Sequence, residues 1–243
     1  MIITSKSNPL IKTVASLSEK KYRKQHGLYL VEGIKPVREC ISAGCEIDRI
    51  ICTEQTASLF PSATIVSESV FKSISDEKTP QGVAAVVKMP ENKLKPPSGS
   101  CILLDCLQDP GNLGTVIRTA NAAGYGEIYL INCTDAYSPK AVRASMSGIF
   151  FVNVYQGCRE EILGVLSGVP LICANMNGEN IFGFSPPEKF CLCIGNEGGG
   201  ISEEVKDRAS YTVKIPMRDT CESLNAAVSA GIAMYALKNK NQR

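Results

Sequence analysis

Histidine is almost absent from this chain, because His26 is the only one among 243 residues. Serine or cysteine nucleophiles that depend on a histidine base, and metal sites built from imidazoles, would all need this residue. His26 lies close to Arg23 and Lys24 in a polar segment, where an exposed side chain is the simpler interpretation. We therefore expect neither histidine-based catalysis nor a metal site.

The chain also lacks a large net charge and a long apolar run. Its 26 Lys and Arg against 24 Asp and Glu give a formal charge of +2, which excludes a histone-like polycation. No run approaches the roughly 18 apolar residues of a membrane span, and the first twelve residues, MIITSKSNPLIK, lack the apolar core of a secretory signal. With 44% hydrophobic and 21% charged residues, the composition predicts a folded, soluble, cytoplasmic protein with no membrane partner.

Cysteine is plentiful, but a disulfide framework is not expected. The count is eleven, which is odd, and no CxxC occurs. Several cysteines lie inside apolar runs such as FCLCIG at 190–195. They are interpreted as small buried side chains that stay reduced in the cytoplasm.

A stretch rich in proline, PENKLKPPSGS at 90–100, predicts a boundary between two domains. We place a small domain at 1–93, a linker at 94–100 and a larger domain at 101–243. The small domain alternates strand-like and amphipathic helical runs, which predicts an α/β fold. It is the basic part of the chain, with 13 Lys and Arg against 10 Asp and Glu, whereas the remainder has 13 against 14.

The segment KKYRKQHGLYL at 20–30 combines cations with two tyrosines. This composition suits phosphate contacts and base stacking, although a solvated charged surface explains the same residues. The candidates for contact with a nucleic acid are cations of this segment and one of the larger domain: Lys21, Arg23, Lys24 and Arg143.

In the larger domain, short apolar runs alternate with helical segments, as in CILLDC followed by GNLGTVIRTANAAG. The runs are continuously apolar, which predicts strands buried on both faces of a mostly parallel sheet. The predicted fold class is α/β, with helices on both faces of this sheet. Ligands of such sheets bind beyond the carboxyl ends of the strands.

Three polar, glycine-containing stretches follow predicted strands, at 103–124, 194–202 and 215–232. None carries the G-x-G-x-x-G or P-loop pattern, which disfavours a nicotinamide enzyme or a P-loop NTPase. Their glycines would let the backbone approach a planar ligand, although ordinary strand-to-helix turns use glycine too. Asn112 is interpreted as a helix cap or loop residue, and Ser223 as a cap of the last helix. The small side chains of that helix suit a core or a dimer interface.

Taken in order, these stretches resemble motifs 1, 2 and 3 of the SpoU/TrmH branch of the SPOUT methyltransferases, and the resemblance covers about 100–238. Ser147 departs from the family pattern, because a glycine is expected there. Residues 1–93 also resemble the L30e-like substrate-binding domain of many members. The matching positions are Asp109, Pro110, Asn112, Gly114 and Arg118 in motif 1, Gly195, Asn196, Glu197 and Gly198 in motif 2, and Ile215, Pro216, Met217, Ser223, Leu224 and Asn225 in motif 3.

The resemblance implies S-adenosyl-L-methionine as cofactor, a C-terminal trefoil knot and a homodimer whose partner completes the site. It implies that Arg118 acts on a ribose hydroxyl, either as a general base or as a cation that stabilises the developing oxyanion, since a guanidinium is normally protonated. The implied positioning residues are Asn112, Glu197, Ser223 and Asn225, and the implied cofactor residues are Gly195, Asn196, Gly198, Ile215, Met217 and Leu224.

The favoured function is therefore methylation of a ribose 2′-hydroxyl in structured RNA, with no DNA partner. Ribosomal RNA is preferred to transfer RNA because of the N-terminal domain. Two alternatives stay open, namely an RNA-binding or ribosome-assembly module with a vestigial site, and a relative that methylates a base.

Overall fold

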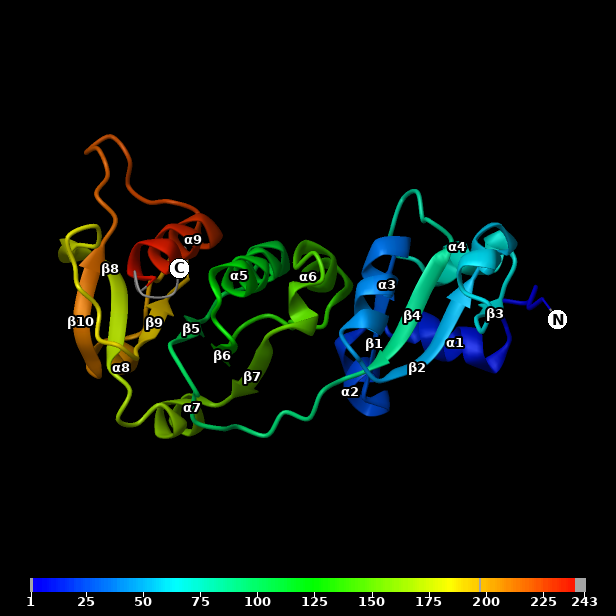
Figure 1. Ribbon diagram of the computed structural model, residues 1–243, viewed down its shortest axis with the longest axis horizontal. Coiled ribbons are helices and arrows are strands. Elements are labelled where there is room, and N and C mark those ends of the chain that lie inside the picture. The colour runs from blue at the N-terminus through cyan, green and yellow to red at the C-terminus, as the bar shows by residue number, and fades with distance from the viewer. Residues whose placement is uncertain (1, 197, 239–243) are drawn as a thin grey trace.

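The computed structural model describes residues 2–196 and 198–238 and contains two α/β units that an extended segment joins (Figure 1). The N-terminal unit has a four-stranded sheet in the order β1-β4-β2-β3, in which β4 pairs antiparallel with both neighbours. Its elements are α1 (Pro9–Ser16), α2 (Lys20–His26), β1 (Leu28–Glu32), α3 (Ile34–Ser42), β2 (Ile47–Cys52), η1 (Glu54–Leu59), β3 (Thr64–Ile65), α4 (Glu68–Ile74) and β4 (Val83–Lys88).

Strand β4 explains why the N-terminal unit has a core on each side of its sheet. Successive side chains of a strand point to opposite faces. Ala84 and Val86 pack in one buried cluster with α1 and α4, whereas Val83, Ala85 and Val87 pack in another with α3. The apolar run GVAAVV is therefore a strand covered on both faces, as its lack of alternation indicates.

The C-terminal unit is a six-stranded sheet in the order β10-β8-β9-β5-β6-β7, and all of its pairings are parallel. The predicted parallel sheet is thus confirmed. Its elements are β5 (Cys101–Asp105), α5 (Pro110–Ala123), β6 (Glu127–Ile131), α6 (Pro139–Ala144), η2 (Gly148–Phe150), β7 (Asn153–Gly157), α7 (Arg159–Val165), β8 (Leu171–Asn180), β9 (Cys191–Ile194), α8 (Glu203–Lys206), β10 (Ala209–Lys214) and α9 (Ala226–Leu237).

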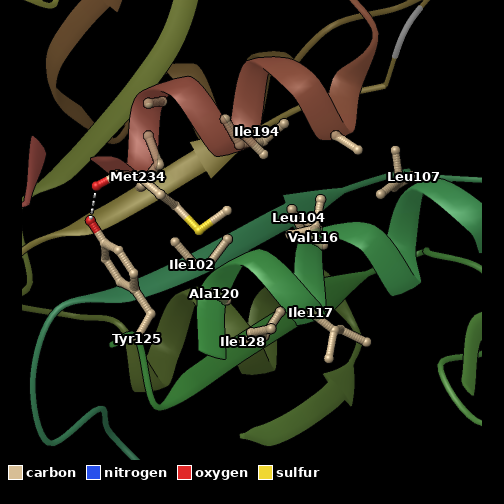
Figure 2. Close-up of a cluster of buried hydrophobic side chains, with 14 of the residues drawn as sticks. Ile102, Leu104, Leu107, Val116, Ile117, Ala120, Tyr125, Ile128, Ile194 and Met234 are labelled. Atoms are coloured by element: carbon tan, nitrogen blue, oxygen red, sulfur yellow. Dashed lines mark hydrogen bonds between the residues drawn. The ribbon is translucent and has the colours of Figure 1, made fainter. Parts of the chain in front are cut away.

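Helices cover both faces of this sheet. Ile102 and Leu104 of β5 pack under α5 and α9, and Figure 2 shows this cluster, in which the Tyr125 hydroxyl donates a hydrogen bond to the Met234 carbonyl at 3.2 Å. Cys101 and Leu103 point to the other face, toward α7 and α8. All eleven cysteines are free thiols, and most of them are buried. Within the described residues, no helix is long and apolar enough to cross a membrane.

The segment between β4 and β5 contains no helix or strand, yet it is fastened to the C-terminal unit. The side-chain amide of Asn92 exchanges two hydrogen bonds with the backbone of Gln156, at 2.6 and 2.9 Å. The Tyr129 hydroxyl donates to the Lys95 carbonyl at 2.7 Å. Asn92, in the last residues assigned to the small domain, is thus bonded to the edge strand β7, and the expected linker is bonded to β6 through Lys95.

Arg23 joins the two units instead of facing RNA. Its side chain is only 3% exposed, and its guanidinium donates to Asp135 at 2.6 and 3.1 Å and to the carbonyls of Leu17 and Ser18. Beside it, the rings of Tyr29 and Tyr137 meet across the same interface at 5.0 Å. The predicted RNA contact is therefore corrected for Arg23, because a buried guanidinium paired with Asp135 cannot reach a phosphate.

Candidate active site

The last residue of strand β5, Asp105, is a buried carboxylate that is hydrogen-bonded to a neighbouring loop. Asp105 is completely buried, and its carboxylate accepts from the backbone N–H of Ser202 at 2.8 Å and from its hydroxyl at 2.5 Å. Arg159 lies 3.5 Å from the same carboxylate. Burial is the largest single influence and would raise the pKa of Asp105, but the hydrogen bonds from Ser202 and Cys106 and the charge of Arg159 together outweigh it and hold the pKa below its usual value. In the folded protein the Asp105 side chain is therefore a charged carboxylate, and this form accepts the hydrogen bonds from Ser202.

The loop that follows β9 is a tight glycine turn held at both ends. The side-chain amide of Asn196 donates to the Cys106 carbonyl at 2.9 Å, and its oxygen accepts from the backbone N–H groups of Gly198 and Gly199. A Cβ on Gly195 would lie 2.1 Å from the carbonyl carbon of Gly200, so only glycine fits there. Glu197, predicted as a positioning residue, lies outside the described residues.

A cavity of about 330 Å³ opens beside this glycine turn, between β8, β9, β10 and the start of α9. We call it the glycine-loop cavity. Its volume is within the range of small-molecule sites. It is lined by all six predicted cofactor residues and by Ser223: Gly195, Asn196, Gly198, Ile215, Met217 and Leu224.

The starts of α5 and α9 meet beside this cavity. Asn225 is the N-cap of α9, where its oxygen accepts from the backbone of Ala227 and Val228, and its amide nitrogen donates to the side-chain oxygen of Asn112 at 3.0 Å. Two predicted site residues that are 113 positions apart are thus in contact.

The predicted helix caps need correction at both starts. Ser223 does not cap the last helix, because Asn225 does. Asn112 is inside the first turn of α5, because Asp109 is the N-cap and accepts from the Asn112 backbone at 2.8 Å. The capping residue of α9 lies two residues after the predicted one, and that of α5 lies three residues before it.

Arg118 lies apart from the glycine-loop cavity, which it does not line. It is exposed on α5 and makes no hydrogen bond or ion pair with any residue in the described part of the chain. Its backbone is closely packed, since a Cβ on Gly148 would lie 3.0 Å from the Cα of Arg118. The described fold therefore brings together Asn112, Asn225 and Ser223, and leaves the Arg118 guanidinium open to solvent.

The other predicted RNA contacts differ in their surroundings. Lys21 and Lys24 are exposed on α2, where the Lys21 ammonium lies 5.6 Å from the ring centre of Tyr22. Arg143 is paired with Asp76 at 3.1 Å and with Glu77 at 3.8 Å, both in the N-terminal unit. His26 is exposed, as expected.

Sequence reasoning missed three residues of this region. Asp105 carried a signal, since a carboxylate at the end of a buried strand must be paired or solvated. Lys206 lines the glycine-loop cavity from α8, and Met176 lines it from β8, but neither stands in a recognisable pattern. Among the described residues, no three His, Cys, Asp or Glu side chains are grouped as metal ligands.

Comparison with known proteins gives matches along almost the whole chain. The model of the SpoU rRNA Methylase family matches residues 99–235, and that of the MRM3-like substrate binding domain matches residues 8–85. The 23S rRNA (guanosine(2553)-2′-O)-methyltransferase RlmP of Bacillus subtilis is 33% identical over 245 residues, which cover 97% of this chain and 98% of that protein.

Solved structures agree with this comparison. The AdoMet-bound rRNA methyltransferase of Sinorhizobium meliloti superposes with a TM-score of 0.88 at 27% identity, covering 97% of this chain and 96% of the other. The SpoU methyltransferase AviRb of Streptomyces viridochromogenes, in complex with AdoMet, superposes with a TM-score of 0.85 at 25% identity, covering 94% and 96%.

Proposed function

This chain belongs to the SpoU rRNA Methylase family, and from that premise we propose that it methylates a ribose 2′-hydroxyl of 23S ribosomal RNA with S-adenosylmethionine as methyl donor. The observation that carries the proposal is the convergence of the three predicted motifs. The second and third line one cavity, and the first contacts the third through Asn112 and Asn225.

The glycine-loop cavity fits this cofactor. The missing Cβ of Gly195 lets the turn close on itself, so that the backbone of the turn forms one wall of the cavity. Ile194, Ile215 and Leu224 provide apolar surface for the adenosine part. When bound, S-adenosylmethionine supplies an electrophilic methyl group on a sulfonium sulfur.

We propose that Arg118 stays charged, orients an RNA phosphate and stabilises the alkoxide that develops on the ribose oxygen. Its exposure supports this role, because the guanidinium is open to an incoming RNA phosphate. Asn112 and Asn225 position the ribose through their paired amides. We propose the same positioning role for Ser223, which lines the cavity, and for Glu197 on the ground of its match to the second family motif.

Labelled S-adenosylmethionine and 23S rRNA transcripts test the proposal. We expect the wild type to bind the cofactor in calorimetry and to leave an alkali-resistant dinucleotide, the mark of 2′-O-methylation. Arg118→Ala should lower kcat by about 10²–10³-fold, the usual effect of removing one oxyanion donor. Asn121→Ala, one turn further along the exposed side of α5, serves as control. A fully active Arg118→Ala enzyme would refute the role.

The relatives methylate different nucleotides, since their names specify guanosine 2553, uridine 2479 and adenosine 1067 of 23S rRNA. The target nucleotide of this enzyme therefore has to be identified by mapping the methylated sites in its RNA substrate. Comparing the 2′-O-methyl sites of total RNA from cells with and without the gene would identify it. A site in transfer RNA would overturn the ribosomal substrate and leave the reaction type in place.

A homodimer is proposed because α9 is apolar on all sides. A helix of this kind is normally buried all round. One side packs on α5 and β9, but Val228 and Tyr235, which lie on one stripe of the helix, are 51% and 54% exposed. Gly231 lies between these two residues in the helix, and a Cβ added to it would be 3.6 Å from the Thr119 side chain. Because Thr119 is the residue after Arg118, a second copy docked on this stripe would lie close to Arg118.

Mixed dimers test whether the partner completes the site. Arg118→Ala and Asn225→Ala are each expected to be inactive, and their mixture should recover about a quarter of the wild-type activity if each site takes Arg118 from one copy and Asn225 from the other. A mixture without activity, or a wild type that is monomeric by light scattering, would contradict the proposal.

We propose three further properties of this chain, namely its domain limits, a trefoil knot and its location. The domain limits 1–93, 94–100 and 101–243 are supported by the absence of helix and strand between Lys88 and Cys101. The trefoil knot is supported by the path of the chain, which leaves the edge strand β10 and returns to pack α9 over β9 near the middle of the sheet (Figure 1). A cytoplasmic location is supported by the proposed ribosomal substrate.

A further inference from the structure

A second cavity, of about 450 Å³, lies between the two units and shares no lining residue with the glycine-loop cavity. We call it the interdomain cavity. The N-terminal unit contributes β1, the start of α3 and the loop before β4, and the C-terminal unit contributes α6 and the turn at η2. Its volume is that of a site for a small planar molecule.

The walls of the interdomain cavity combine apolar side chains with charged ones, and most of these charges already have partners. Pro36, Val142 and Phe150 provide the apolar surface. The carboxylate of Glu32 accepts from Ser75 and from the backbone of Asp76, and Arg143 pairs with Asp76 and Glu77. These charged side chains are thus engaged with protein partners, and the apolar part of the wall favours an uncharged aromatic ring over a phosphate.

Polar groups with spare capacity lie at the edge of the same cavity. Gln81 uses its side-chain oxygen to accept from the Ile34 backbone, and its amide nitrogen donates to no described residue. The hydroxyl of Ser147 is buried and has no hydrogen-bond partner among the described residues, although Ser147 lines the cavity and is 5% exposed. Buried polar groups without a hydrogen-bond partner are rare in native structures, so this hydroxyl is a candidate for contact with a ligand.

The backbone at this wall is strained as well. Met146 and Ser147 have φ values of 44° and 68°, a left-handed conformation that side chains other than glycine rarely adopt. Strain of this kind concentrates at functional sites. The glycine that the family pattern leads one to expect at Ser147 would relieve the strain, but it would also remove the hydroxyl.

The interdomain cavity lies one helix away from the candidate active site. Helix α6 lines the cavity with Pro139 and Val142, and it packs tightly on α5, since a Cβ on Gly114 would lie 2.4 Å from the Ala141 carbonyl oxygen. Packed helix axes are about 8–10 Å apart. Gly148, next to Ser147, lies close to the backbone of Arg118, since an added Cβ would be 3.0 Å from the Arg118 Cα. RNA whose ribose lies at Arg118 therefore has its neighbouring nucleotides within reach of this cavity.

We propose that the interdomain cavity binds one unpaired base of the RNA substrate, close in sequence to the methylated nucleotide, through packing on Val142 and Phe150 and hydrogen bonds to Gln81 and Ser147. Unstacked bases are the usual objects of sequence-specific RNA recognition. Lys35 at the rim is largely exposed and lies 3.8 Å from the Glu39 carboxylate, and its ammonium would exchange this partner for the phosphate of that nucleotide. The inference rests on the proposed function and adds a specificity site to it.

The test uses the full-length enzyme and 23S rRNA transcripts that carry 4-thiouridine or 6-thioguanosine for photo-crosslinking. Gln81→Ala, at an exposed position, should raise KM for the transcript about three- to tenfold and leave kcat and the cofactor Kd unchanged. Thr79→Trp, also exposed, should block the mouth of the cavity and have a larger effect. Gln55→Ala is the matched control, because Gln55 lies in the same unit but outside this cavity.

Crosslinked peptides should include residues 142–150. Unchanged KM values for Gln81→Ala and Thr79→Trp, together with crosslinks that avoid 142–150, would overturn the inference while the wild type still methylates RNA. If the cavity instead holds a protein partner, methylation of purified transcripts will be unaffected by both variants, which overturns it equally. A wild type that does not methylate RNA at all would mark the failure of the proposed function.

Discussion

Replacing Asp105 by asparagine tests the idea that a buried charge at the end of β5 holds the glycine turn in place. The carboxylate accepts two hydrogen bonds from Ser202 and lies 3.5 Å from Arg159, in a position with no exposed surface. Asparagine keeps one acceptor oxygen and presents an NH₂ group to the second donor. One hydrogen bond to a charged group contributes about 1.5–3 kcal/mol, so we expect a loss of about 2 kcal/mol.

The loss should be visible in thermal unfolding and in cofactor binding. For a chain of this size, 2 kcal/mol corresponds to a fall in Tm of about 4–8 °C. Ser202 follows Ile201, which lines the glycine-loop cavity, so the Kd for S-adenosylmethionine should rise, by about tenfold if 1.4 kcal/mol of the loss is felt there. Asp48→Asn, at an exposed position of β2, is the control and should change neither value.

The pH dependence gives the sharper test of the same reasoning. Because the folded pKa of Asp105 is lowered, its contribution is complete above the unfolded value, near 4, and is lost as the pH falls through the folded pKa. The difference in unfolding free energy between wild type and Asp105→Asn should therefore be constant from pH 5 to 8 and shrink below about pH 4. Equal stability at pH 7, or a difference that is just as large at pH 2, would refute the reasoning.

Three further changes test the same architecture. Gly195→Ala should abolish cofactor binding in calorimetry, because its Cβ would lie 2.1 Å from Gly200. Gly199→Ala has nothing near its Cβ and should still bind the cofactor. Equal affinities of the two variants would contradict the close approach of Gly195 and Gly200. Asn225→Ala should lower the stability to urea by about 1 kcal/mol through loss of the α9 cap, and Ser223→Ala should not; a reversed order would restore Ser223 as the cap. Asp135→Asn should cost about 3–5 kcal/mol because it leaves the buried Arg23 unpaired, and a change below 1 kcal/mol would show that the units do not depend on this ion pair.

Much of the fold could be predicted because its strands are short and apolar throughout. The runs CILLDC and KFCLCIG can be buried on both faces only in the interior of a sheet, and they form β5 and β9, which pair with each other near its centre. Once these strands are parallel, their carboxyl ends share one edge, so the following loops must gather there. The clustering of Gly195, Asn196 and Ile215 around one cavity follows from this geometry.

The predictions that were wrong concern residues whose environment depends on partners far away in the chain. Arg23 resembles its exposed neighbours Lys21 and Lys24 in sequence, and only the position of Asp135, 112 residues later, decides that it is buried. The caps were misjudged by a few residues, because Ser223 and Asn225 are both good N-cap types. The choice between them depends on where α9 docks, which also brings Asn225 to Asn112.

Backbone strain shows why the rest could not be predicted from local preference. The four residues other than glycine with positive φ are, among the described residues, Cys106, Asn132, Met146 and Ser147, all in the C-terminal unit. Two of them follow the adjacent strands β5 and β6, where the Cys106 backbone N–H donates to the Ile131 carbonyl at 2.8 Å. Each such conformation costs about 1–2 kcal/mol for a residue with a Cβ. Local preference would therefore avoid them, and tertiary hydrogen bonds such as that from Asn196 to the Cys106 carbonyl must offset the cost. The strained positions thus lie where the strand ends meet the glycine turn and the two cavities, so that the shape of the site is set by long-range contacts.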